Sequence, residues 1–278
     1  MDVSALTDAE IGAAVNKLRH PQANEATVAI LIYYGDEFHQ HGSGILIRLH
    51  DRSFLITASH VAERGSGYSL YLRGQSDRPA PLGGRLLLTT VRPGDEFDYH
   101  DIAVWELSEE TLSALEGSVF LRQDAFETGE ELADDFYFLT GFPASLASKS
   151  GKGDEHRIIL TPFTYIAMQF RGDRSNLLGY LNGLHLLLGK TNPLELSGEI
   201  GGWPESLGGI SGCAVWRAHT AEGVWSEGSA RLAAIQTGVY FGGAIIKATP
   251  LSSAMSVIFD CYPELRRVLG ISLPRRPR

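Results

Sequence analysis

The stretch Thr57-Ala58-Ser59-His60 ends a run of β-forming residues, Ser53–Thr57, with a histidine just past the strand. An imidazole at a strand end can project into a cleft instead of into a packed core. Its unperturbed pKa of about 6.5 suits it to act as a general base, and then as a general acid, near pH 7. The alternative is a surface histidine at a strand end, so the reading of His60 depends on its partners.

A carboxylate is the first such partner. Asp101 stands directly before a second apolar strand, Ile102-Ala103-Val104-Trp105. A carboxylate at the point where a strand enters the core is costly to bury unless it accepts hydrogen bonds. The Nδ1–H of a histidine would satisfy it and fix the tautomer of the ring. Asp98 is a competing candidate for the partner of His60, but Asp101 adjoins the strand directly. The alternative for Asp101 is an ordinary aspartate in a turn.

A serine completes the set. Ser211 lies in the glycine-rich sequence Gly208-Gly209-Ile210-Ser211-Gly212. A serine hydroxyl is a poor nucleophile near neutral pH unless a base and a set of oxyanion donors stand beside it. Glycines allow a sharp turn that exposes backbone N–H groups, so we expect the amides of Gly209 and Ser211 to form an oxyanion hole. An ordinary Gly-Ser turn is the alternative, because Ser43 and Ser66 also have glycine on both sides.

The composition is that of a globular protein with a substantial core: 278 residues, 44% hydrophobic and 21% charged. The formal net charge of −9 argues against a general nucleic-acid binder, which needs clustered Lys and Arg to neutralise phosphates. The basic end Arg275–Arg278 reads as a short solvated tail. With only two cysteines, Cys213 and Cys261, the sequence indicates no disulfide framework.

Targeting and cofactor signals are lacking. Residues 1–18 have neither the basic nor the apolar region of a secretion signal, and no apolar run approaches the ~18 residues of a membrane span. We therefore expect a cytoplasmic, bacterial protein that does not bind membranes. His39-Gln40-His41 puts two rings on one face of a strand, but the sequence offers no further ligands for zinc. No P-loop or dinucleotide fingerprint occurs, so we expect neither a metal nor an organic cofactor.

Most of the chain has the pattern of short β-strands. Before them, Thr7 and Glu10 form a capping box that predicts a helix over residues 7–19. β-Rich runs separated by turn residues predict strands at 27–34, 42–49, 53–57, 68–72, 85–91, 102–107, 136–140, 156–161, 164–170, 213–217, 231–237 and 244–248. Residues 108–115, 252–259 and 263–269 are expected to be helical, and residues 171–206 to contain long loops.

A polar, acidic stretch over 122–135 divides the strands into two groups. Strands at such close spacing are typical of a barrel or a sandwich. We expect the following division: an N-terminal helical extension over 1–24, a first β-barrel over 25–125, a second β-barrel over 126–250, and a C-terminal helix with the basic tail over 251–278.

In this order and setting, TASH at 57–60, DIAV at 101–104 and GISGCA at 209–214 resemble the three catalytic motifs of the chymotrypsin-like serine peptidases. The resemblance covers about residues 26–250. It implies a mainly all-β fold of two six-stranded antiparallel barrels of the chymotrypsin type, with a cleft between them. It also implies the sites of the triad: His60 and Asp101 on the first barrel and Ser211 on the second.

Two positions depart from the family pattern. Secreted members carry Asp before the serine, where it pairs with a new N-terminus after zymogen cleavage, and Ile210 cannot form this ion pair. Cys213 replaces a common glycine, and we expect it to point into the barrel and not to act as a nucleophile. Activation by N-terminal trimming is therefore not expected.

The resemblance further suggests two residues of a substrate pocket. Glu205, six residues before Ser211, would lie at the base of the primary pocket and favour Lys or Arg side chains. The alternative is a solvent-facing glutamate in an irregular loop. Thr237 would support Asp101 and line the substrate channel.

Together these features favour a serine endopeptidase that cleaves protein or peptide substrates through an acyl-enzyme. One alternative is a catalytically silent, protease-like binding or scaffold module. Another is a protease gated by an activating protein partner within a bacterial stress or defence system, since uncontrolled proteolysis inside a cell would be harmful. The sequence does not separate constitutive from gated activity.

Overall fold

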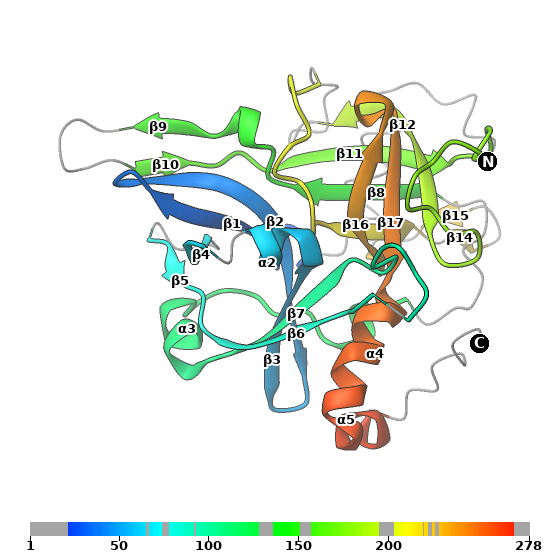
Figure 1. Cartoon of the computed structure of the whole chain (residues 1–278). Helices are drawn as coiled ribbons and strands as arrows, with labels where there is room; N and C mark the ends of the chain where they lie inside the picture. Colours follow the sequence, from blue (N-terminus) through cyan, green and yellow to red (C-terminus); the bar gives the residue numbers. More distant parts are fainter. Residues whose placement is uncertain are drawn as a thin grey trace.

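The computed structural model describes residues 22–64, 67–73, 78–91, 93–127, 136–150, 157–194, 203–218, 220–221, 224–225 and 228–269. Two β-structures lie against each other, and the helices α4 (Leu251–Cys261) and α5 (Pro263–Val268) stand at the foot of the view (Figure 1). The helix predicted over 7–19, the basic tail and residues 128–135 of the acidic stretch lie outside the described residues.

The first β-structure is an antiparallel sheet of seven strands in the order β5-β4-β1-β2-β3-β7-β6. Its strands are β1 (Thr27–Tyr34), β2 (Glu37–Leu49), β3 (Arg52–Ala58), β4 (Ser69–Arg73), β5 (Ala80–Pro81), β6 (Gly84–Leu88) and β7 (Ile102–Leu107). Gly35 and Asp36, with φ of 59° and 62°, form the two-residue turn between β1 and β2. The hairpin pairing starts at Tyr34↔Glu37, so β2 is longer than the predicted strand over 42–49.

This sheet curls because its two edge strands, β5 and β6, follow each other closely in the chain. β5 pairs with β4 and β6 pairs with β7, and only Leu82 and Gly83 separate β5 from β6. Gly84 permits the bend: its φ is +125°, and a Cβ there would lie 2.0 Å from the carbonyl oxygen of Glu106. The two ends of the sheet are thus joined by a short connection, and the result is a half-barrel where we expected a closed six-stranded barrel.

The second β-structure is a closed six-stranded barrel in the order β11-β12-β17-β16-β13-β8. Its strands are β8 (Phe136–Gly141), β11 (Phe163–Gln169), β12 (Leu186–Leu194), β13 (Ala214–Ala218), β16 (Arg231–Tyr240) and β17 (Ile245–Pro250). Smaller elements lie outside both sheets: α3 (Glu109–Ala114), the hairpins β9 (Ser148–Ser150) with β10 (Arg157–Ile159) and β14 (Thr220–Ala221) with β15 (Val224–Trp225), and the 3-10 turns η2 (Gln123–Ala125), η3 (Ala144–Leu146) and η4 (Phe241–Gly243).

Alternation along the strands sends side chains into two different cores. In β3, Leu55 faces the interior of the first sheet, whereas Phe54 and Ile56 face the other way. That other face joins Phe138 and Trp216 of the second barrel in one shared apolar core. α4 adds six buried residues to it: Leu251, Ala254, Met255, Val257, Ile258 and Phe259. Burial of this shared core therefore fixes the sheet, the barrel and α4 relative to one another.

The prediction of a mainly β fold is confirmed, but residues 171–206 contain a strand where we expected long loops. β12 is a full member of the barrel, paired with β11 on one side and β17 on the other. Its sequence, LLLGKTNPL, contains a glycine, a lysine and a proline, which hide the alternating pattern of a strand. The domain boundaries after residues 24, 125 and 250 stay predictions.

Within the described ranges, every helix is too short or too polar to span a lipid bilayer.

The shared core makes a stability prediction. Trp216 is fully buried, and its ring stacks on that of Phe138 at a centroid distance of 6.1 Å. We expect Trp216→Ala to lower the free energy of unfolding by about 3–5 kcal/mol, because it leaves a cavity between the sheet and the barrel. Urea denaturation measures this. Val268→Ala, at an exposed position on α5, is the control and should change stability by about 0.5 kcal/mol at most. Similar losses for the two variants would contradict the shared core.

Candidate active site

His60 and Asp101 meet where β3 and β7 lie side by side. β3 ends at Ala58 and the short helix α2 (Ser59–Arg64) begins at once, so His60 lies in its first turn. Nδ1 of His60 lies 2.8 Å from Asp101 Oδ2, and the backbone N–H of His60 donates to Asp101 Oδ1 at 2.9 Å. With Nδ1–H facing a carboxylate, the lone pair of Nε2 is left to accept a proton.

The backbone of Asp101 takes a left-handed conformation, with φ of 50°, which is uncommon and costly for a residue other than glycine. In this conformation its carbonyl oxygen accepts from the N–H of Ser59 at 3.0 Å, while its carboxylate accepts from the N–H of His60. N–H groups in the first turn of a helix have no partner within the helix. Asp101 therefore holds both the ring of His60 and the helix that carries it.

Asp98, the competing carboxylate, makes different contacts. Its Oδ2 accepts from the hydroxyl of Thr89 at 2.5 Å, and its Oδ1 accepts from the N–H of His100 at 3.1 Å. The structure thus pairs His60 with Asp101.

The glycine-rich sequence around Ser211 forms a tight loop. Gly209 and Gly212 have φ of 92° and 88°, and the N–H of Gly212 donates to the carbonyl of Gln236 at 2.8 Å. By contrast, the N–H groups of Gly209 and Ser211 donate to no acceptor in the part of the chain that the structure describes. Two unused donors, one on the serine itself and one two residues before it, are what an oxyanion hole requires.

Ser43 on β2 ties this loop to the first sheet. Its N–H donates to the carbonyl of Ser211 at 2.8 Å. Its hydroxyl donates to the carbonyl of Gly209 at 2.9 Å and accepts from the N–H of Phe142 at 2.9 Å. Gln40 adds to these contacts between the sheet and the barrel, which we call the seam. Its side-chain N–H₂ donates to the carbonyls of Phe142 at 2.9 Å and Gly209 at 3.3 Å. The loop that carries Ser211 is thus fixed by groups of the opposite sheet.

The same loop lies against β3, the strand that leads to His60. A Cβ on Gly212 would lie 2.0 Å from Thr57 Oγ1 and 2.2 Å from the carbonyl oxygen of Ser43, so only glycine fits. Thr57 is three residues before His60. The hydroxyl of Ser211 makes no hydrogen bond to the described residues, His60 included, and catalytic hydrogen bonds are often long in unliganded enzymes.

Ile210 anchors the loop from below. It is 1% exposed and belongs to the apolar core of the barrel, against which Leu146, Trp203 and Leu207 also pack. Cys213 is fully buried in the same core, and burial raises the pKa of its thiol far above the ordinary range. A thiol that stays protonated is not a nucleophile, which agrees with the expectation from the sequence.

The two predicted pocket residues have different surroundings. Glu205 is exposed. Thr237 is buried in β16, and its hydroxyl lies 3.1 Å from that of Thr249, which in turn donates to the carbonyl of His100 at 2.8 Å. Thr237 therefore reaches the residue before Asp101 through Thr249 and does not touch the carboxylate itself. Their roles in a pocket stay predictions.

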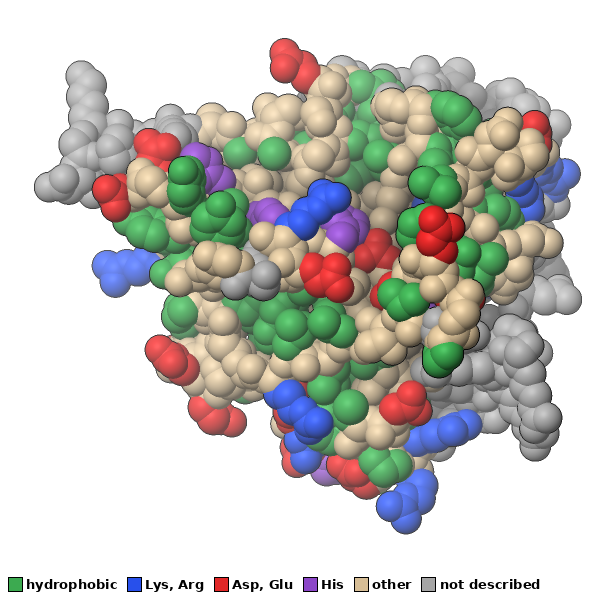
Figure 2. Space-filling view, in the orientation of Figure 1, with side chains coloured by type: hydrophobic (Ala, Val, Ile, Leu, Met, Phe, Trp, Pro, Cys, Tyr) green, Lys and Arg blue, Asp and Glu red, His purple; other side chains and the backbone are tan. Residues whose placement is uncertain are grey.

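Charged and histidine side chains gather near the middle of the face shown in Figure 2, in the region of α2. Two of the histidines of the first sheet have protein partners: His39 Nε2 lies 3.3 Å from the carbonyl of Tyr34, and His41 Nε2 lies 2.9 Å from that of Val61. No group of three or more His, Cys, Asp or Glu side chains suited to a metal ion occurs among the described residues.

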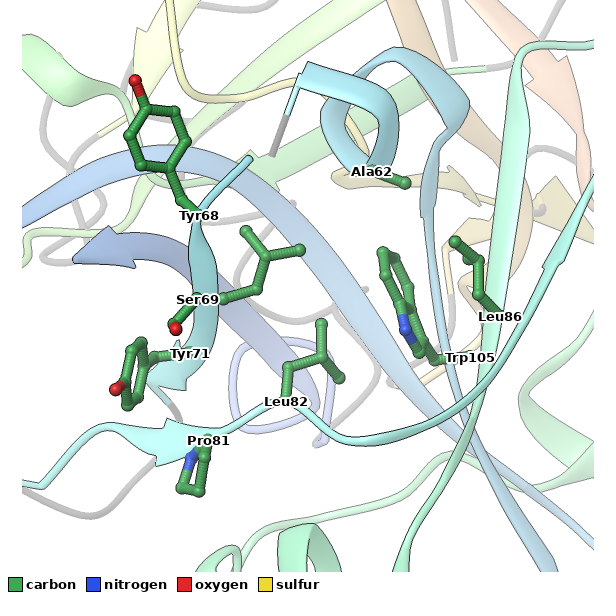
Figure 3. Close-up of a pocket in the computed structure, with 9 residues that line it drawn as sticks. Ala62, Tyr68, Ser69, Tyr71, Pro81, Leu82, Leu86 and Trp105 are labelled. Carbon is green, nitrogen blue, oxygen red and sulfur yellow. The ribbon is translucent and has the colours of Figure 1, made fainter. Parts of the chain in front are cut away.

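An apolar hollow of about 360 Å³ opens in the first sheet beside α2 (Figure 3). Ala62, Leu82, Leu86 and Trp105 border it, and Tyr68 lies at its edge. Neither His60 nor Asp101 lines it, so the polar pair belongs to a different surface.

Two residues near Asp101 carried no signal in the sequence. His185, just before β12, is 8% exposed; its Nδ1 accepts from the N–H of Leu181 at 2.9 Å and its Nε2 donates to the carbonyl of Tyr99 at 2.6 Å. Burial lowers the pKa of His185 to about 4, so the ring is neutral near pH 7. Lys247 on β17 is the other. A single histidine or lysine outside any motif cannot be told from a surface residue without the fold.

No protein-family model matches the sequence, and no curated protein matches it. Solved structures do match its fold. Kallikrein-related peptidase 10 in complex with Zn²⁺ is 17% identical and matches over 88% of this chain and 99% of its own, with a TM-score of 0.50. A thermostable serine protease, AL20, from an extremophilic microorganism is 11% identical over 85% of this chain and 96% of its own, with a TM-score of 0.49.

The protease Anisep from Arthrobacter nicotinovorans is 13% identical over 83% of this chain and 92% of its own, with a TM-score of 0.48. At these identities likeness shows the fold alone. The match to the kallikrein-related peptidase, together with the closed six-stranded barrel and the half-barrel beside it, shows that this chain has the chymotrypsin-like fold of serine proteases.

The close fit of Gly212 leads to one prediction. Gly212→Ala should lower the free energy of unfolding more than Gly35→Ala, which serves as its matched control. Both glycines have positive φ, which costs about 1–2 kcal/mol for alanine. A Cβ on Gly35 meets nothing within 4 Å, whereas on Gly212 it meets Thr57 and Ser43, which adds about 1–3 kcal/mol. Urea denaturation of the two variants tests this, and equal costs would contradict the packing of the loop against β3.

The neutral state of His185 leads to a prediction about the pH dependence of stability. Its pKa is about 4 when folded and about 6.5 when unfolded, so the unfolded chain binds the proton more readily. The stability that His185 contributes is complete above pH 6.5 and is lost as the pH falls towards 4. Between pH 7.5 and 5 the wild type should lose about 2 kcal/mol more unfolding free energy than His185→Gln. Denaturation at both pH values measures this, and parallel losses would contradict a neutral His185.

Proposed function

We propose that this chain is a serine endopeptidase whose nucleophile is Ser211, whose base is His60 and whose orienting carboxylate is Asp101. The observation that carries the proposal is the two-point contact of Asp101 with His60, at 2.8 Å to the ring and 2.9 Å to the backbone. It holds the ring in the tautomer that a general base needs. The unused N–H groups of Gly209 and Ser211 support it independently.

In this mechanism the hydroxyl of Ser211 attacks the carbonyl carbon of the scissile bond, and Nε2 of His60 takes the hydroxyl proton. The negative charge on the carbonyl oxygen is stabilised by the N–H groups of Gly209 and Ser211. The C–N bond then breaks, and His60 gives its proton to the leaving amine. Water repeats the sequence on the acyl-enzyme and restores the serine.

The substrate strand would run along β16. The ladder between β13 and β16 ends at Ala214↔Ile235, and beyond it residues 238–240 pair with β17 on one side. Gln236, at the start of this stretch, accepts from the N–H of Gly212, so the edge begins next to the serine loop. An extended peptide could add to such an edge by main-chain hydrogen bonds.

Control of the activity is the second part of the proposal. We infer that N-terminal cleavage does not switch it on, because the buried Ile210 fills the place of a carboxylate that could pair with a new N-terminus. We assign the activity to the bacterial cytoplasm, on protein or peptide substrates, with an activating partner as the alternative to constitutive activity. Glu205 and Thr237 remain the candidates for the substrate pocket.

Replacement of the triad tests this function. Asp101→Asn should lower turnover by about 10⁴, because the ring is then held in the wrong tautomer. Ser211→Ala should abolish both peptide hydrolysis and labelling by a serine-reactive fluorophosphonate. The measurements are hydrolysis of a fluorogenic peptide library and gel detection of the label.

The matched control is Asp98→Asn, which removes a nearby carboxylate that does not contact His60 and should leave turnover largely intact. Labelling that persists in Ser211→Ala would show that the nucleophile is another residue. A wild type that is neither labelled nor active, alone or with cell extract, would favour the silent binding module.

A further inference from the structure

Lys247 on β17 lies beside Gly238, its partner in the ladder with β16. The lysine stem fills the space that a side chain on Gly238 would take: a Cβ there would lie 3.2 Å from Lys247 Cε and 3.6 Å from Lys247 Cβ. Beyond the stem, Nζ donates to the carbonyl of Gly179 at 3.5 Å. This bond is at the long limit, and it is the single hydrogen bond of Nζ within the described residues.

The carboxylates near Lys247 are engaged elsewhere. The charges of Asp101 and Asp98 act on the ammonium, yet neither forms an ion pair with it among the described residues. Both oxygens of Asp101 accept from His60. Those of Asp98 accept from Thr89 and from a backbone N–H. The ammonium therefore keeps donors that no protein group in the described ranges uses.

Two opposing effects act on the charge of the Lys247 ammonium. Burial lowers the pKa of Lys247, but the negative charges of Asp101 and Asp98 oppose this effect. His185, which interacts electrostatically with Lys247, has its pKa lowered by burial to about 4 and is neutral near pH 7, so it adds no second positive charge. Lys247 itself is partly exposed, so its ammonium can be reached from solvent.

We propose that the ammonium of Lys247 is a subsite for the side-chain carboxylate of an Asp or Glu of the substrate, near the bond that is cleaved. The proposal rests on the peptidase function and on the substrate strand along β16. Alternate side chains of such a strand point down onto the sheet, and Gly238 leaves the way open to Nζ. A charge-assisted hydrogen bond there favours an acidic side chain over its amide by about tenfold.

Ser211→Ala tests the subsite without catalysis, since it removes only the nucleophile. A random octapeptide library is passed over immobilised Ser211→Ala, and the retained peptides are sequenced by mass spectrometry. We expect Asp and Glu to be enriched about tenfold over Asn and Gln at one position. Adding Lys247→Met keeps the stem and removes the charge, so the enrichment should vanish. Adding Lys247→Glu should favour Lys and Arg at that position.

The matched control is Arg266→Met in the same background, because it removes one positive charge on the exposed side of α5 and should leave the enrichment unchanged. Equal recovery of acidic and amide peptides, or an enrichment that survives Lys247→Met, would overturn the subsite. Failure of the peptidase function has a different signature. The wild type would then neither cleave the selected peptides nor react with a fluorophosphonate, while Ser211→Ala still selected acidic peptides through Lys247.

Discussion

The hydrogen bond from the N–H of Ser43 to the carbonyl of Ser211 joins the two halves of the candidate site. His60 and Asp101 belong to the first sheet and Ser211 to a loop of the barrel, so their distance depends on how the sheet and the barrel meet. Reacting groups have to be placed to within a fraction of an ångström for a useful rate. A backbone bond with its own fixed geometry, reinforced by the Ser43 hydroxyl and by Gln40, supplies that precision.

The shared apolar core acts on a coarser scale. Phe54 of the sheet, Trp216 of the barrel and Met255 of α4 are buried together, and close packing leaves little room for the sheet and the barrel to slide. Core and seam have separate tasks: the core brings the two surfaces together, and the seam fixes which atoms face each other. The serine loop is fixed separately, because Ile210 is buried in the apolar core inside the barrel.

Many strands and the contact between His60 and Asp101 could be predicted from the sequence, because local residue patterns determine them. β1 and β7 begin and end where the strand pattern predicts, and the pairing of His60 with Asp101 follows from a carboxylate that needs a donor. β12 could not be found, since its pairing with β11 and β17, and not its own pattern, makes it a strand. The part that Ser43 plays was hidden for a related reason: its N–H acts through the backbone, which every residue has. His185 and Lys247 acquire their surroundings only when distant segments meet.

The left-handed backbone of Asp101 links the capping of helix α2 to the positioning of the His60 ring. Through its carbonyl and its carboxylate, Asp101 takes the first two N–H groups of α2, a helix of six residues that is too short to be stable by itself. The cap of this helix comes from a residue more than forty positions away, so α2 can close only when β7 has docked beside β3. The contact between His60 and Asp101 and the helix that carries His60 therefore depend on each other. A change that displaces β7 from β3 would thus remove the partner of the His60 ring and the cap of its helix together.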